Sequence, residues 1–259
     1  MFRGDKQDRR GSSLKRILWC ITGAGGYLRR LFQKFLDLRS TYPGLELGIA
    51  ISRAGEEVAR IYGVLDDLEK IVSGGRYGGL YRDSSWSGIT EDGVPLGGRI
   101  SLRRYDVVIV APATSNTVAK IAHGIADTLP TIAASQALKS EVPLLILPAD
   151  CAESSLTTLP CHIDEQRCTC CLLCVDACPF EAIRLFSKNA VRIDYNECRG
   201  CGRCENACPA GAIRCWEETR ITPSSIDLEN IAKLRRVRGL HVLESPEELI
   251  EKLKSLLKI

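Results

Sequence analysis

The 259-residue sequence contains no apolar run that approaches the roughly 18 residues needed to span a bilayer. Its first segment, MFRGDKQDRRGSSLKR, also lacks the apolar core of a signal peptide. Basic residues exceed acidic ones by only three, 35 against 32, so charge alone indicates neither nucleic acid nor an anionic membrane as a partner. These absences favour a cytoplasmic protein without a membrane span or a nucleic-acid partner.

Cysteine, in contrast, is abundant, with 13 residues, and eight of them form two runs. Each run has the pattern C-x2-C-x2-C-x3-C-P and continues into P-x-x-A-I, and the second repeats the first 30 residues later. Structural zinc sites use paired knuckles rather than such triplets, and disulfide scaffolds are expected in secreted proteins. The runs therefore indicate iron–sulfur clusters rather than zinc or disulfides.

The duplicated runs resemble bacterial-type ferredoxins with two [4Fe–4S] clusters, in which the fourth cysteine of each run ligates the other cluster. This resemblance implies two crossed ligand sets. The first is Cys168, Cys171, Cys174 and Cys208, and the second is Cys198, Cys201, Cys204 and Cys178.

Five cysteines remain outside these sets: Cys20, Cys151, Cys161, Cys170 and Cys215. Cys170 fits no ligand position, and Cys20 is expected to be a small core residue. Without an export signal, we expect a reducing cytoplasm in which thiolates hold metal and do not form disulfides.

The first 150 residues alternate between apolar strands and amphipathic helices. Strands are predicted at 16–22, 45–52, 105–112 and 142–149, and helices at 27–38, 56–62 and 118–126. This alternation predicts an α/β fold with a doubly wound, Rossmann-like or flavodoxin-like parallel sheet, with ligands at the carboxyl ends of the strands.

Three strand ends carry residues suited to an anionic cofactor: Thr22 to Gly26, Ser52 with Arg53, and Ala113 to Thr117. The first loop is not G-x-G-x-x-G because Leu28 occupies the third glycine position, which argues against a nicotinamide dinucleotide. A glycine turn after a strand is also a common structural feature.

The segments PATSNT (112–117) and GIADTLPT (124–131) resemble paired signatures of the homo-oligomeric FMN-containing flavoproteins, a family that includes cysteine decarboxylases and flavin prenyltransferases. The resemblance covers about residues 15–152 and implies FMN at the interfaces of trimers that build larger shells. Mapped onto this sequence, it implies that FMN contacts lie at Thr22, Gly23, Ala24, Gly25, Gly26, Ser52, Arg53, Ala113, Thr114, Ser115, Asn116 and Thr117, with Ala126 and Asp127 near the flavin.

The decarboxylases of that family use a histidine between the second and third strands and a methionine-containing substrate clamp. Here histidine occurs only at His123, His162 and His241, and methionine only at position 1. LPADCAESS stands where the clamp would begin. Without the acid/base group and the clamp, decarboxylation is not expected.

Residues 73–98 carry eight glycines together with Tyr77, Tyr81 and Trp86. Long loops within compact domains are usually functional or disordered. These aromatic side chains are predicted to cover a planar substrate above the flavin, or alternatively to form an oligomer contact. Asp83 and Glu91 are candidate proton donors.

The sequence closes with a short strand, GLHVLES, and an amphipathic helix with Ser245 as N-cap, Pro246 at N1 and Glu248 at N3. Such a pair cannot stand alone, so we expect it to return to the flavin sheet. The predicted domains are 1–159 plus 222–259 for FMN, with an inserted ferredoxin domain at 160–221.

The combination of this flavoprotein pattern with an inserted ferredoxin module resembles the archaeal dihydromethanopterin reductases (acceptor). The resemblance implies an oxidoreductase that reduces a pterin C=N bond with FMN, electrons being supplied through two [4Fe–4S] clusters by a ferredoxin or another one-electron donor. The alternatives are an electron-transfer flavoprotein without an organic substrate, and a redox sensor or flavin carrier. The catalytic residues and the direction of electron flow are left open.

Overall fold

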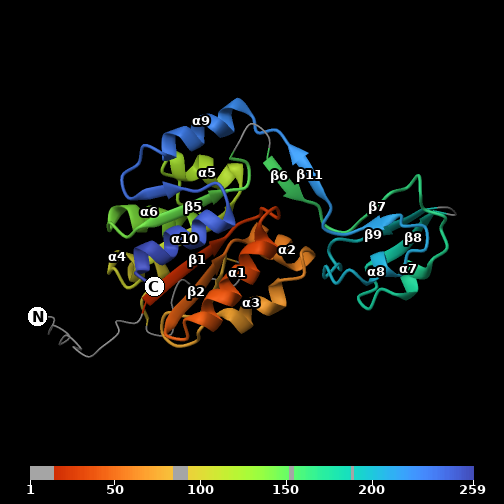
Figure 1. Ribbon diagram of the computed structural model, residues 1–259, viewed down its shortest axis with the longest axis horizontal. Coiled ribbons are helices and arrows are strands. Elements are labelled where there is room, and N and C mark those ends of the chain that lie inside the picture. Colours follow the sequence, from red (N-terminus) through yellow and green to blue (C-terminus); the bar gives the residue numbers. More distant parts are fainter. Residues whose placement is uncertain (1–14, 84–92, 152–154, 188–189) are drawn as a thin grey trace, which may run out of the picture.

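The computed structural model describes residues 15–83, 93–151, 155–187 and 190–259. Its larger part is built on a six-stranded sheet in which all neighbouring strands are parallel (Figure 1). In spatial order the strands are β12 (Leu240–Val242), β5 (Leu144–Pro148), β4 (Val107–Ala113), β1 (Lys15–Ile21), β2 (Leu45–Ile51) and β3 (Leu80–Arg82).

This sheet confirms the predicted α/β class, and its strand order is that of a Rossmann fold. The chain builds outward from β1 to β2 and β3, and then crosses back to place β4 on the other side of β1. The crevice between the carboxyl ends of β1 and β4 is therefore the switch point, where ligands bind in such folds.

Helices cover both faces of the sheet because alternate strand residues are buried on each side. Trp19 of β1 stacks on Phe35 on one face, whereas Leu18 and Cys20 belong to the core of the other face. The first face carries α1 (Leu28–Thr41), α2 (Arg53–Ile61), α3 (Leu65–Ile71) and α10 (Pro246–Leu257); the second carries α4 (Leu96–Ser101), α5 (Ser115–Ala122), α6 (Leu129–Lys139) and α9 (Ser225–Leu234).

A smaller module lies between β5 and α9 in the sequence and to one side of the sheet in space (Figure 1). An antiparallel ribbon of β6 (Ser155–Thr158) and β11 (Glu218–Ile221) leads into and out of it. Its elements are β7 (His162–Ile163), α7 (Leu173–Asp176), β8 (Ile183–Ser187), β9 (Ala190–Ile193), α8 (Arg203–Asn206) and β10 (Ile213–Arg214).

After the module the chain returns to the main sheet. β12 pairs in parallel with β5, and Leu249 and Leu253 of α10 are fully buried. Ser245 caps α10 by accepting a hydrogen bond from the amide of Glu248, whose carboxylate accepts from Glu244. The module thus interrupts the chain between two strands of one sheet, while its exact boundaries stay a prediction.

In the glycine-rich segment 73–98, the described tyrosines do not both lie as predicted for side chains that cover a substrate. Tyr77 is buried and packs edge-on against Tyr105, and Tyr81 lies on the unexpected strand β3 and accepts a hydrogen bond from Arg99. The prediction is therefore wrong for Tyr77, because its ring serves the core. Trp86 and Glu91 lie outside the described residues.

Two predicted helix limits are also corrected. The helix expected at 118–126 is α5, which begins at Ser115 and ends at Ala122, because Gly124 with φ of 73° turns the chain away. The helix expected at 56–62 begins earlier, at Arg53, because Ser52 caps it. None of the helices in the described ranges is long and apolar enough to cross a membrane.

Candidate cofactor sites

The carboxyl ends of β1 and β4 are joined by the hydroxyl of Thr22. This buried hydroxyl donates to the carbonyl of Pro112 (2.7 Å) and accepts from the amide of Thr114 (3.0 Å). The end of β2 is joined as well, since the amide of Ser52 donates to the carbonyl of Ile21. The structure therefore brings together the three loops that the sequence assigned to FMN.

The glycine loop that follows β1 packs tightly on α2 and on the residue after it. A Cβ added to Gly23 would lie 2.9 Å from the Ala54 Cβ, and one added to Gly25 would lie 2.2 Å from the Tyr62 ring. Only glycine permits this approach, which holds the loop close to α2 at the edge of the switch point. Such a loop leaves room for a phosphate or ribityl chain over the strand ends, so these residues fit FMN.

Two of the predicted FMN contacts also act as helix caps. The Ser52 hydroxyl accepts from the amide of Gly55 at the start of α2, and the Thr114 hydroxyl accepts from the amide of Thr117 at the start of α5. Both helices therefore point their amino ends, with partial positive charge, toward the switch point. Arg53, the first residue of α2, has a largely exposed side chain that forms an ion pair with Glu57.

Asp150 was not among the predicted residues, although it lies directly after β5 at the same edge of the sheet. One carboxylate oxygen accepts from the Ser115 hydroxyl (3.0 Å), and the other is buried with no hydrogen-bond partner among the described residues. An unpaired buried carboxylate oxygen is costly unless a ligand completes it. Asp150 directly follows the fourth predicted strand (142–149), and this position could have indicated a ligand-binding residue.

The two residues predicted near the flavin, Ala126 and Asp127, are exposed on the segment between α5 and α6. Asp127 forms an ion pair with Lys120 of α5 (2.7 Å), which lowers the pKa of its carboxyl. Asp83 lies nearby at the end of β3 and accepts from the amide of Leu129. Burial raises the pKa of Asp83, which suits a group that holds a proton.

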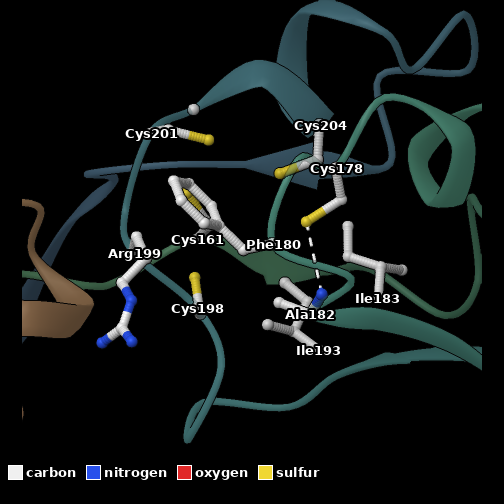
Figure 2. Close-up of a pocket in the computed structure, with 11 residues that line it drawn as sticks. Cys161, Cys178, Phe180, Ala182, Ile183, Ile193, Cys198, Arg199, Cys201 and Cys204 are labelled. Carbon is white, nitrogen blue, oxygen red and sulfur yellow. Dashed lines mark hydrogen bonds between the residues drawn. The ribbon is translucent and has the colours of Figure 1, made fainter.

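The eight cysteines of the two runs surround two separate cavities in the module. Cys168, Cys171, Cys174 and Cys208 line one, here called the first cavity. Cys178, Cys198, Cys201 and Cys204 line the other, the second cavity, with Phe180, Ile183 and Ile193 beside them (Figure 2). Each cavity thus combines three cysteines of one run with the fourth of the other, which fits the crossed pattern implied by the ferredoxin resemblance.

The fourth cysteine of each run has the same backbone partner. The Ala182 amide donates to the Cys178 sulfur (3.4 Å, Figure 2), and the Ala212 amide donates to the Cys208 sulfur (3.3 Å). The repeated P-x-x-A-I segment therefore supplies one N–H to each cavity. Hydrogen bonds of this kind tune cluster potentials. Burial raises the pKa of the Cys204 thiol to about 11, so metal binding must displace its proton.

The expectation that no disulfide forms is wrong, because Cys161 and Cys215 are joined. The pairing of His162 with Arg214 places these two cysteines opposite each other at the next position of the β7–β10 ribbon. Their sulfurs lie within 4.8 Å of the Cys204 sulfur. Cys170 adopts a left-handed conformation (φ 54°) at the wall of the first cavity, and Cys20 is buried in the core as expected.

Known families match both parts of the chain. The flavoprotein family matches residues 5–156, and the 4Fe-4S dicluster domain matches residues 167–212. The dihydromethanopterin reductase (acceptor) of Methanosarcina mazei is 41% identical over 92% of this chain and 99% of its own length. That of Methanocaldococcus jannaschii is 45% identical over 94% of this chain and 97% of its own length.

Solved structures agree with this assignment. Burkholderia xenovorans DmrB in complex with FMN, described as a cubic protein cage for redox transfer, is 26% identical with a TM-score of 0.57, and the match covers 95% of this chain and 98% of that one. The cypemycin decarboxylase CypD, 13% identical with a TM-score of 0.51 over 95% of this chain and 94% of its own, shares the fold alone. The chain therefore belongs to the flavoprotein family and, with its dicluster domain, to the iron–sulfur flavoproteins related to dihydromethanopterin reductase (acceptor).

Proposed function

We propose that this protein reduces dihydromethanopterin to tetrahydromethanopterin, using FMN and electrons supplied through two [4Fe–4S] clusters. The observation that carries the proposal is the end-to-end similarity to two reductases of that name, which spans both the flavoprotein part and the cysteine module. The crossed cysteine sets around the two cavities and the loops at the switch point support it independently.

Bound FMN would supply the ability to collect single electrons and deliver them in pairs as a hydride. The chain's own residues would hold its phosphate at the glycine loop and at the amino ends of α2 and α5. Asp150, with its unpaired oxygen at the carboxyl edge, is placed to accept a hydrogen bond from a ring N–H. Asp83 is the candidate proton donor because burial raises its pKa.

A ferredoxin or another one-electron carrier is the proposed donor, since the clusters exchange electrons singly. We further propose a homo-oligomer built from trimers, with FMN near the subunit interfaces. The cage described for the DmrB structure supports this assembly. Eight cysteines grouped around two cavities suit a reducing compartment, so the cytoplasm is the proposed location.

The test is an anaerobic assay of the purified protein, loaded with FMN and both clusters, with dihydromethanopterin and an artificial one-electron donor. Formation of tetrahydromethanopterin with full cofactor occupancy is expected. Fully loaded protein that takes up electrons yet leaves the pterin unchanged would contradict the reductase function and favour a pure electron-transfer flavoprotein.

A further inference from the structure

The two cavities of the module are placed differently with respect to the flavin domain. The loop that carries Cys198 and Cys201 rests on the end of α2, where Gly63 and Gly200 meet backbone to backbone. A Cβ on Gly63 would lie 2.7 Å from the Gly200 carbonyl oxygen, and a Cβ on Gly200 would lie 2.3 Å from the Ile61 carbonyl oxygen. In Figure 1, α8 lies on the side of the module that faces α2, and α7 lies beyond it.

Tyr62 connects this contact to the predicted FMN loops. Its ring packs on Gly25 of the glycine loop, and its backbone carbonyl carbon is 2.8 Å from the position of a Gly200 Cβ. Its hydroxyl donates to the carbonyl of Thr158 at the base of the module, and its ring is 5.3 Å from that of Trp216. One residue thus touches both the loop assigned to FMN and the loop of the second cavity.

Arg60, two residues before Tyr62, contacts the loop of the second cavity. Its guanidinium donates to the carbonyls of Tyr195 (2.8 Å) and Asn196, which lie three and two residues before Cys198. These bonds hold the loop, and they place a positive charge on the chain segment that leads into Cys198. A positive charge near a cluster favours its reduced, more negative form.

Exposed apolar side chains lie at both cavities. Leu172 and Leu173, directly after Cys171, are 37% and 49% exposed, and Phe180, which lines the second cavity, is 41% exposed. Exposed apolar surface therefore does not distinguish the two cavities, whereas the contact of the second cavity's loop with α2 does.

We propose that electrons cross the module in a fixed order: they pass from the first cavity to the second and leave toward the flavin beside Tyr62, with Arg60 as a positioning residue. The order rests on the proposed function for its final acceptor. Each pass moves one electron and no atom. Two passes deliver two electrons, which with two protons from solvent reduce one C=N bond to CH–NH.

The order can be tested without pterin, by mixing anaerobic protein with a reduced 2[4Fe–4S] ferredoxin and following flavin absorbance and the electron paramagnetic resonance of the clusters. Cys201→Ala should allow reduction of the first cluster while slowing flavin reduction at least 100-fold. Cys171→Ala should slow reduction of both the second cluster and the flavin. Flavin reduction at the wild-type rate in Cys201→Ala would overturn the proposed order.

A milder substitution keeps the test decisive if a cysteine variant fails to fold. Arg60→Gln should make the second cluster's potential more negative and slow flavin reduction about tenfold. The control is Arg167→Gln, whose guanidinium contacts Ala210 beside the first cavity's Cys208, and it should leave the second cluster's potential unchanged. An unchanged second-cluster potential in Arg60→Gln would overturn the role of Arg60.

Because pterin is absent, these outcomes are independent of whether dihydromethanopterin is the substrate. A protein that passes electrons in this order but leaves the pterin unchanged would refute the reductase function alone. A protein that reduces the pterin while its flavin is reduced without the second cluster would refute the order alone.

Discussion

The hydroxyl of Thr22 accepts a hydrogen bond from the amide of Thr114 across the switch point of the sheet, 92 residues away in sequence. Because the same hydroxyl donates to the carbonyl of Pro112, it fixes the relative positions of the loops after β1 and β4. These are two of the three loops predicted to hold FMN. One buried hydroxyl therefore sets the shape of that candidate site.

Thr22→Val should weaken FMN binding, since it leaves the Thr114 amide without its partner while preserving side-chain volume. An unpaired buried group costs about 1–3 kcal/mol, and about 1.4 kcal/mol corresponds to a tenfold change in Kd. We expect at least a tenfold increase in the Kd for FMN, measured by quenching of flavin fluorescence. Thr22→Ser, which retains the hydroxyl, is the control, and wild-type affinity in the valine variant would show that FMN binds elsewhere.

Gly200→Ala should separate the second cavity's loop from α2. The substitution introduces a Cβ 2.3 Å from the Ile61 carbonyl oxygen at a residue with φ of 58°. The matched control is Gly202→Ala, which has φ of 73° but no atom within 4 Å of its Cβ. Both should pay about 1–2 kcal/mol for the left-handed backbone, while only Gly200→Ala adds the clash.

The readout for this pair is the rate of flavin reduction by reduced ferredoxin, with iron content measured in parallel. We expect flavin reduction to be at least tenfold slower in Gly200→Ala, because electron transfer from the second cluster depends on that contact. In Gly202→Ala the rate should remain within about twofold of wild type. Equal rates in the two variants would show that the Gly63–Gly200 contact does not couple the module to the flavin.

Cys178→Ser should remove the cluster of the second run although Cys178 belongs to the first run. Its sulfur lines the second cavity with Cys198, Cys201 and Cys204. Iron should fall from about eight to about four atoms per chain, and the remaining resonance signal should match that of Cys201→Ala. A signal matching Cys171→Ala instead would refute crossed ligation. FMN should stay bound in each variant, and its loss would argue against two separable cofactor sites.

The features predicted correctly from sequence are those encoded by neighbouring residues. The cysteine runs are local in this sense, because three of the four cysteines at each cavity lie within seven positions. The assignment of the fourth cysteine to the other run comes from the ferredoxin resemblance, and the two ligand sets stay a prediction. The cap at Ser245 and the continuous burial of β1 from Ile17 to Ile21 are local in the same sense. The return of β12 and α10 to the main sheet was predicted because a lone strand and helix cannot bury their apolar sides, whereas the pairing of β12 with β5 was not predicted.

The features missed depend on distant residues or on very short segments. β3 has only three residues within a glycine-rich stretch, so no alternating pattern could reveal it. The Cys161–Cys215 pair is separated by 54 positions and is brought together by a two-residue ribbon. The contacts of Arg60 with Tyr195 and Asn196 depend on how the module sits beside the sheet, which no local pattern specifies.

Glu247→Gln should loosen the attachment of the C-terminal helix in a pH-dependent manner. Glu247 lies in the first turn of α10 and pairs with Arg30 and Lys34 of α1, each at 3.0 Å. Hydrogen bonding to Lys34, with a further contribution from Arg30, lowers the pKa of Glu247 to about 2. Because these side chains are 30–55% exposed, solvent screening limits their contribution to about 0.5–1 kcal/mol.

The sign of the pH dependence follows from the lowered pKa. A carboxylate whose pKa is lower in the folded state stabilises the fold above its unfolded pKa of about 4.3, and the stabilisation is lost as pH falls toward about 2. At pH 7, Glu247→Gln should therefore unfold about 1–4 °C below wild type, followed by far-UV circular dichroism. The difference should shrink at pH 3 and in 1 M salt. Glu251→Gln, on an exposed position of the same helix, is the control, and a difference independent of pH and salt would mean that Glu247 acts through packing and not through its charge.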